Sequence, residues 1–175
     1  GYVYAYAANV GGVWQGGTIS GNIRATGGDV YGIALYGGDL AGNVTLDNGL
    51  LYNLTVTGIP GTVSELSAGS RVFAAAGIYR ATFNSADING DLASGLDITA
   101  LQVTGNVAGN IYADMDIYSV NIGGQFSGIL RAGSKLSKFA AGSMSNAVVS
   151  AGWDAGTVYV LNGNMDNSHV LVGAA

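Results

Sequence analysis

A repeat of nineteen residues constrains the fold of this chain more than any other feature. When the sequence is shifted by nineteen, apolar residues of its second half fall on one another in columns. Two of these columns are Leu101, Val120, Phe139 and Val158, and Val103, Ile122, Ala141 and Val160. A period near twenty residues is typical of solenoids, in which each repeat packs mainly on its neighbours.

A short signature marks each repeat: an aliphatic residue, any residue, glycine, Asn or Asp, and a second aliphatic, as in "INGDL" and "VAGNI". The marker glycines are Gly21, Gly42, Gly61, Gly90, Gly109 and Gly128, and Ala147 fills the next position. Their spacings are 21, 19, 29, 19, 19 and 19 residues. The long spacing predicts insertions, a short one near Ser64 and a longer surface loop at residues 77–85.

Within each repeat, apolar residues alternate with small or polar ones, which is the periodicity of a β-strand. Thirty glycines make helices unfavourable. Short strands that recur at a fixed period pair with the equivalent strand of the next repeat. We therefore expect an all-β fold, a parallel β-solenoid of about eight rungs of roughly 19–21 residues, where a rung is one turn of the coil. The coil should be right-handed, as parallel crossovers are.

The chain is expected to form one domain over residues 1–175. Residues 1–18 should hold the strand at its N-terminal end, and residues 153–175 the last rung. A lone rung could not offset its backbone entropy with the few aliphatic side chains that it buries. Stability is therefore expected to come from stacking.

Composition excludes several classes of function. Charged residues make up 10% of the chain and the net charge is −5, so no basic surface is expected to bind nucleic acid. No apolar run is long enough to span a membrane. The chain has no cysteine, which excludes disulfides, thiol catalysis and thiolate metal sites.

The stretch "VNIGGQFSGILRAGSKLSKFAAGSMSNAVVSAG" resembles the repeat tracts of large secreted bacterial surface proteins of the filamentous-haemagglutinin type. This resemblance in pattern and composition extends over residues 19–152. It implies a structural module of an extracellular fibre or cell-surface appendage, without catalytic residues or cofactor. The alternatives are a glycan-binding adhesin domain, then a polysaccharide-degrading β-helix enzyme or an ice-binding protein.

The loop expected at residues 77–85 is the candidate contact site. It carries Tyr79, Arg80 and Phe83, and aromatic and Arg side chains are favoured at interfaces. A protein or a surface glycan could bind there. Packing of the loop on its own solenoid is the simpler interpretation.

One column of the repeat carries charge: Asp97, Asp116, Lys135 and Asp154. A solvated ladder at a corner of the coil, with Lys135 offsetting part of the repulsion between carboxylates, is the expected arrangement. Calcium bound by Asp97, Asp114 and Asp116 is the alternative, since carboxylate oxygens are its preferred ligands. The single histidine, His169, has no second histidine or acidic cluster beside it in sequence to suggest catalysis or zinc binding.

Both ends of the coil are candidate assembly surfaces, because end strands present unpaired backbone groups. At the N-terminal end, Tyr2, Tyr4 and Tyr6 alternate with small apolar residues, and at the other end Val170 and Val172 lie in an apolar segment. Because the two ends differ, contact between them is heterologous and propagates into a filament. We expect head-to-tail stacking, either of separate copies or of adjacent domains of a longer chain.

Overall fold

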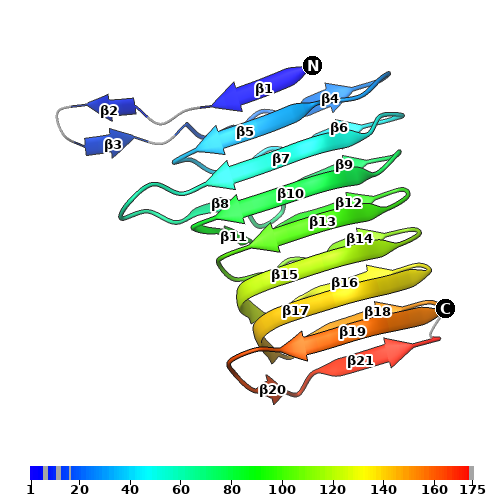
Figure 1. The fold of residues 1–175 in the computed structure, drawn as a ribbon. Coiled ribbons are helices and arrows are strands. Elements are labelled where there is room, and N and C mark those ends of the chain that lie inside the picture. The colour runs from blue at the N-terminus through cyan, green and yellow to red at the C-terminus, as the bar shows by residue number, and fades with distance from the viewer. Residues whose placement is uncertain (6–7, 11–12, 16, 174–175) are drawn as a thin grey trace.

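The computed structural model describes residues 1–5, 8–10, 13–15 and 17–173, with side chains at residues 1, 3 and 17–173. These residues form strands and turns and no helix. The chain winds into a parallel β-solenoid (Figure 1), which confirms the predicted fold. No helix in the described part of the chain has the length and apolar character to cross a membrane.

Two parallel sheets form the long sides of the coil. Sheet 1 contains β1 (Tyr2–Ala5), β5 (Gly32–Tyr36), β7 (Leu51–Thr57), β10 (Ile78–Asn84), β13 (Ile98–Val103), β15 (Ile117–Phe126), β17 (Lys135–Ser145) and β19 (Asp154–Val160) in that order, with β20 (Met165–Asp166) also paired to β17. Sheet 2 contains β4 (Ile23–Ala25), β6 (Val44–Leu46), β9 (Arg71–Ala74), β12 (Asp91–Ser94), β14 (Ile111–Ala113), β16 (Ile129–Ala132), β18 (Val148–Ala151) and β21 (His169–Val172).

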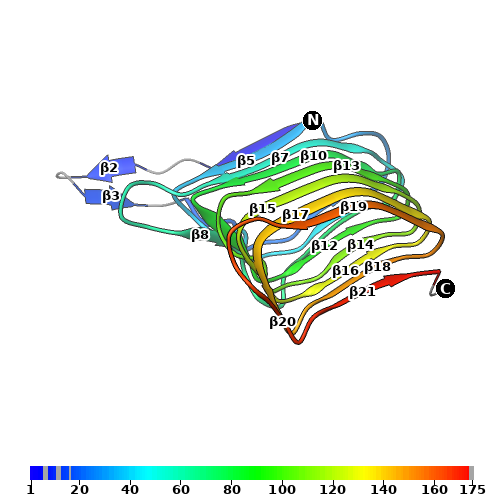
Figure 2. The ribbon, with the colours of Figure 1, turned by 60° about the horizontal axis from the view of Figure 1, so that its bottom comes forward.

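A short third side closes the coil. It consists of β8 (Ser64–Leu66) paired with β11 (Ala86–Ile88) and of single bridges above and below them. Near the N-terminus, β2 (Ala8–Val10) and β3 (Val13–Gln15) form an antiparallel hairpin that projects sideways from the coil (Figures 1 and 2).

The coil is right-handed, as predicted. In Figure 1 the strands of sheet 1 lie in front and run leftward, those of sheet 2 lie behind and run rightward, and the chain descends from N to C. Figure 2, seen more nearly along the coil, shows the same sense of rotation.

The nineteen-residue register is confirmed by the strand pairing. Leu101 pairs with Val120, Val120 with Phe139, and Phe139 with Val158. The interior members of this column are buried, and the Phe139 ring contacts that of Phe126 edge to face, with centroids 5.3 Å apart. Similar columns from both sheets and the third side make one continuous apolar core along the coil.

The marker glycines lie where successive rungs approach most closely. A Cβ added to Gly109 would collide with the carbonyl oxygen of Gly90, and one added to Gly128 with that of Gly109. Gly21, in the first rung, has no neighbour within 4 Å of this position. At Gly109 and Gly128 a glycine therefore permits the close stacking of rungs rather than the shape of the turn, and Ala147 is the small residue that holds this position in the next rung.

The predicted loop at residues 77–85 is wrong, because Ile78–Asn84 is strand β10, paired with β7 on one side and β13 on the other. The main insertion lies at residues 58–63. Val56 and Leu66 are ten positions apart, whereas Phe83 and Ile88, which pair with them, are five apart.

Gly61 is also not a marker glycine, because it belongs to this inserted loop and has a φ of +87°. The marker position of its rung is held by Ser70, which lies two residues before Val72, the partner of Val44. Ser70 is buried. The spacing of 29 residues was therefore counted from a loop glycine, Gly61, to a marker glycine, Gly90.

Candidate functional site

The last rung exposes side chains that would be buried anywhere else in the coil. Val170 pairs with Val149 and Val172 with Ala151. Val149 and Ala151 are 0% and 1% exposed, but Val170 and Val172 are 38% and 53% exposed. The two valines predicted at an assembly surface are therefore core residues without a rung beyond them in the described structure.

The first rung is open in the same way. Val3, Ile19, Ile23 and Ala25 pack against the core from the N-terminal side and are only partly buried. Tyr2 and Tyr4 lie on β1, at the outer edge of sheet 1. Tyr6, the third predicted interface tyrosine, lies outside the described residues.

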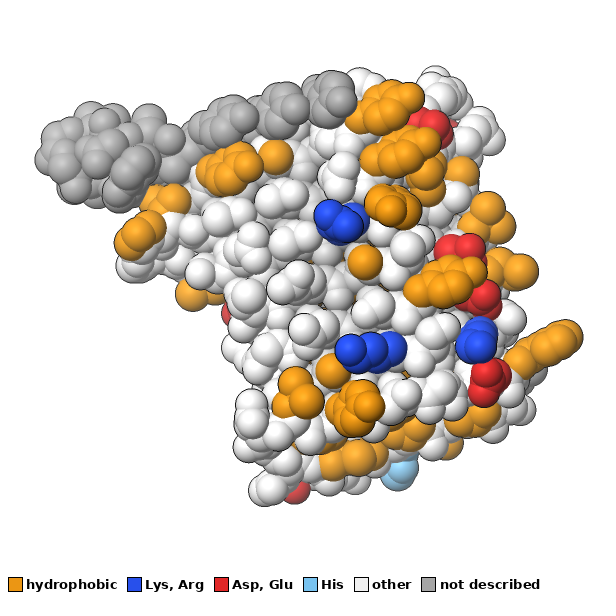
Figure 3. All heavy atoms as spheres, in the orientation of Figure 1, with side chains coloured by type: hydrophobic (Ala, Val, Ile, Leu, Met, Phe, Trp, Pro, Cys, Tyr) orange, Lys and Arg blue, Asp and Glu red, His pale blue; other side chains and the backbone are white. Residues whose placement is uncertain are grey.

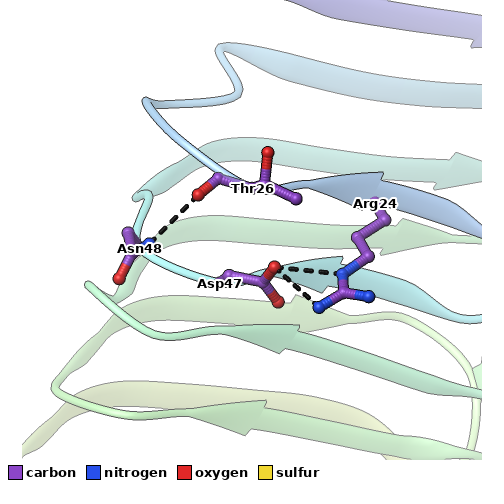
Figure 4. A network of polar contacts seen from close by, with 4 residues as sticks. All are labelled: Arg24, Thr26, Asp47 and Asn48. Carbon is purple, nitrogen blue, oxygen red and sulfur yellow. Dashed lines mark hydrogen bonds and ion pairs between the residues drawn. The ribbon is translucent and has the colours of Figure 1, made fainter.

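The first two rungs are joined by polar contacts at one corner, shown in Figure 4. The Arg24 guanidinium donates to Asp47 through Nε at 3.0 Å, and its NH2 lies 3.0 Å from the same carboxylate oxygen. Asn48 Nδ2 donates to the carbonyl oxygen of Thr26 at 3.0 Å. These contacts hold the outermost rung of sheet 2 in register with the next.

The charged column joins rungs through the backbone as well as by ion pairing. Asp97 Oδ1 accepts from the backbone N–H of Asp116 at 2.9 Å, and Asp116 Oδ1 accepts from that of Lys135 at 3.0 Å. Lys135 Nζ lies 3.3 Å from Asp154 Oδ2. Asp97 and Asp116 are half-buried, and Lys135 and Asp154 are exposed. The predicted solvated ladder is therefore correct only for Lys135 and Asp154.

The Asn and Asp residues of other columns make the same contact. Asn22 Oδ1 accepts from the backbone N–H of Asn43 at 3.0 Å, and Asn106 Oδ1 accepts from that of Gln125 at 2.9 Å. Asn22 follows the marker Gly21, a position where Asn is typical of a local turn. Its side chain connects one rung to the next instead.

The three candidate calcium ligands do not form a metal site in the described structure. No group of three or more His, Asp or Glu residues there is arranged to hold a metal ion. The carboxylate of Asp97 accepts from the backbone of Asp116 instead. His169 is exposed on β21, the last strand of sheet 2.

The carboxylates of Asp97 and Asp116 act on Tyr118. They raise the pKa of the Tyr118 phenol above its ordinary value because they disfavour the phenolate, more strongly than Lys135 lowers it. The side chain is exposed, so this is a surface effect.

The candidate contact residues lie on β10 rather than on a loop. Tyr79 and Arg80 are exposed on the outer face of sheet 1, but Phe83 is fully buried and cannot contact a partner. A contact at Tyr79 and Arg80 stays a prediction.

Tyr79 belongs to a row of tyrosines on sheet 1. The rings of Tyr31 and Tyr52 are stacked, with centroids 5.0 Å apart and planes at 10°, and the Tyr79 centroid is 6.4 Å from that of Tyr52. Figure 3 shows a row of hydrophobic side chains near one edge of this face, with charged side chains beside it. Rings stacked on one another present mainly their edges to solvent.

Sequence reasoning missed a hollow on the outer face of sheet 2. It is lined by Phe73, Tyr112 and two arginines, Arg71 and Arg131, and by Ala93, which is itself buried. The signal was present, because the shift by nineteen aligns Ala93 with Tyr112 and Arg131. That alignment was interpreted only for the apolar columns of the core, and its outward columns were not.

Comparison with known proteins gives no family: no family model matches the chain, and neither a curated protein nor a solved structure matches it.

Proposed function

We propose that this chain is a non-catalytic structural module that builds an extracellular fibre by stacking head to tail. The observation that carries the proposal is the open last rung, where Val170 and Val172 occupy core positions but are exposed. An exposed sheet edge beside exposed core side chains is a template for another strand.

The two ends are complementary in register. In sheet 1, Val3 and Val158 belong to one column of inward residues, and in sheet 2, Ile23 and Val170 belong to another. A second copy placed below the first, with the same polarity, would continue both columns and keep all strands parallel. The contact is heterologous and open, so it generates filaments rather than closed dimers.

Two sequence properties support the proposal of an extracellular fibre, one its location and the other its assembly. The segment from Val120 to Gly152 resembles repeat tracts of secreted bacterial surface proteins, and fibres of that kind are built from such coils. A surface poor in charge suits lateral and axial contacts rather than a freely diffusing monomer.

Sedimentation velocity and electron microscopy of the purified chain test the proposal. We expect association that grows with concentration, and rods longer than the roughly 40 Å of eight rungs. Val170→Asp should abolish association, because it places a charge in the junction. Leu171→Asp is the matched control, since Leu171 is exposed on the outward face of the same strand.

Two results would contradict head-to-tail stacking. One is a single monomeric species at high micromolar concentration. The other is equal loss of association in the Leu171→Asp variant, which would point to non-specific contact of the last strand.

A further inference from the structure

Asparagine is followed directly by glycine at three places in this chain. The pairs are Asn48 and Gly49, Asn89 and Gly90, and Asn162 and Gly163. In such a pair the backbone nitrogen of the glycine can attack the side-chain carbonyl carbon of the asparagine, because glycine has no side chain to hinder the approach. The attack needs a glycine N–H without a hydrogen-bond partner and a backbone that is free to turn. The three pairs are equal in sequence, so the structure decides which of them can react.

The pair at Asn89 lies inside the stack of rungs. The Gly90 N–H donates to the carbonyl oxygen of Leu66 at 2.9 Å, and Asn89 Nδ2 donates to the carboxylate of Glu65. Gly90 is buried, and a Cβ added to it would collide with the carbonyl oxygen of Ser70. Attack by the Gly90 nitrogen would therefore require the rungs to separate first.

The pair at Asn48 is also enclosed by neighbouring rungs. Asn48 Nδ2 donates to the carbonyl oxygen of Thr26 at 3.0 Å (Figure 4). Gly49 is buried, and a Cβ added to it would collide with the carbonyl oxygen of Gly28. On its other side, the carbonyl oxygen of Gly49 accepts from the backbone N–H of Ala76 at 3.2 Å. Gly49 is thus packed between the rung before it and the rung after it.

The pair at Asn162 lies on the connection between β19 and β20, in the last rung (Figures 1 and 2). Val160 and Met165 are five positions apart, whereas Ala141 and Met144, which pair with them, are three apart. The connection therefore contains two more residues than the rung before it. These residues leave the ladder as a short loop.

Asn162 and Gly163 are both exposed in this loop. The backbone N–H of Asn162 donates to the carbonyl oxygen of Gly142 at 3.1 Å, and a Cβ added to Gly163 would meet the side chain of Ser143. The loop is thus covered by the rung before it and by no further rung of the described structure. Within the described residues, neither the Asn162 side chain nor the Gly163 N–H takes part in a hydrogen bond. The attacking nitrogen and the group that it attacks are both without the contacts that hold the other two pairs.

We propose that Asn162 is a site of spontaneous deamidation, with water as the co-reactant. The Gly163 nitrogen forms a bond to Cγ of Asn162 and gives up its proton, which passes through solvent to the departing amide nitrogen. The bond between Cγ and Nδ2 breaks, ammonia leaves and a cyclic imide remains. Water then opens the imide at either of its two carbonyl carbons. The products are aspartate and isoaspartate, and in isoaspartate the backbone runs through the side-chain carbonyl.

The reaction changes the charge of the last rung. Each product adds one carboxylate to a chain whose net charge is −5. Isoaspartate also lengthens the backbone of the loop. Because the loop lies outside the ladder, the pairing of Met165 with Met144 should persist, and the far-ultraviolet circular dichroism of the coil should stay the same.

Peptide mass spectrometry during incubation of the folded protein at mildly alkaline pH tests the proposal. Each pair is followed by the mass gain that accompanies replacement of the amide by an acid. We expect Asn162 to convert at least about tenfold faster than Asn48 and Asn89, because those two require local opening of the stack. The protein is kept dilute, since a second copy stacked on the last rung would cover the loop.

Incubation in concentrated urea, followed by the same digestion, is the matched control. Without the stack, the three pairs should convert at rates within about threefold of one another. Asn162→Gln should remove the modification, because the longer side chain would have to close a larger ring. Asn164→Gln, in the same loop, should leave the rate at Asn162 unchanged.

Two results would overturn the proposal. One is conversion of Asn48 or Asn89 as fast as that of Asn162 in the folded protein, which would show that stacking gives no protection. The other is an Asn162 that stays intact in the folded protein over the time in which it reacts in urea, which would show that the loop is held as firmly as the ladder. Neither result bears on head-to-tail stacking, which sedimentation measures.

Discussion

Val149 and Val170 occupy one column of the same coil, one rung apart, but only the first has neighbours on both sides. Val149 is fully buried between Leu130 and Val170, and Val170 is 38% exposed. The side chain, strand type and inward direction are the same in both. Burial in this molecule is therefore supplied by the next rung, and interior and end rungs should respond differently to the same substitution.

The largest difference is expected from removing an aromatic side chain of the core. Phe139→Ala deletes a fully buried ring that packs on Phe126, and it should lower the free energy of unfolding by about 3–5 kcal/mol. Val158→Ala, one rung later in the same column, should cost less than about 1 kcal/mol. Urea denaturation of the two variants measures both values, at concentrations low enough to keep the chain monomeric. Val120→Ala, at a fully buried interior position of the same column, removes the same atoms as Val158→Ala, and equal losses from these two variants would show that the end rung is as well packed as the interior.

A smaller difference is expected from the marker glycines. Gly109→Ala forces a Cβ onto the carbonyl oxygen of Gly90, and it should destabilise the coil by about 1–3 kcal/mol. Gly21→Ala meets nothing within 4 Å and should change stability by no more than about 0.5 kcal/mol. Thermal unfolding followed by circular dichroism separates the two, and a neutral Gly109→Ala would contradict the close approach of rungs.

The smallest effect is expected in the charged column, where the half-buried Asp97 and Asp116 act on the pKa of Tyr118. Asp97 and Asp116 raise the pKa of this phenol, so the folded state holds the proton more tightly than the unfolded chain. Stability from this group is present below the ordinary tyrosine pKa and is lost as pH rises through the raised value. Asp116→Asn should lower the pKa of Tyr118, as NMR titration of its ring carbon can show. Asp154→Asn, at the exposed end of the column, should leave that pKa nearly unchanged.

The sequence was sufficient to predict the coil because one shift aligns several inward columns of its second half. The pairing of Leu101, Val120 and Phe139 follows from that shift alone. The first half was harder, because glycine has two uses there. At Gly109 a glycine permits the close approach of rungs, and at Gly61 it permits a positive φ in a loop. The amino-acid sequence does not distinguish these two roles.

The contacts between polar side chains and the next rung were also beyond sequence reasoning. An Asn or Asp beside a glycine is typical of a local turn, and only the stacked coordinates show that Asn22 reaches the backbone of Asn43. The hollow on the outer face of sheet 2 has the same origin. It depends on which outward residues are neighbours across rungs, and a shift by nineteen places Phe73 on Leu92, whereas its partner in the structure is Ala93.

The inserted loop at residues 58–63 has a consequence for how such a coil can change over time. Before the loop, β7 keeps its register with β10, from Leu51 paired with Ile78 to Thr57 paired with Asn84. After it, β8 pairs in register with β11, with Leu66 opposite Ile88. Five additional positions thus leave the ladder as it was in both adjacent rungs. The length of a rung can therefore change at this corner without a change in the geometry of the core. The corner can acquire, lengthen or exchange an exposed peptide segment while the coil that displays the segment stays the same.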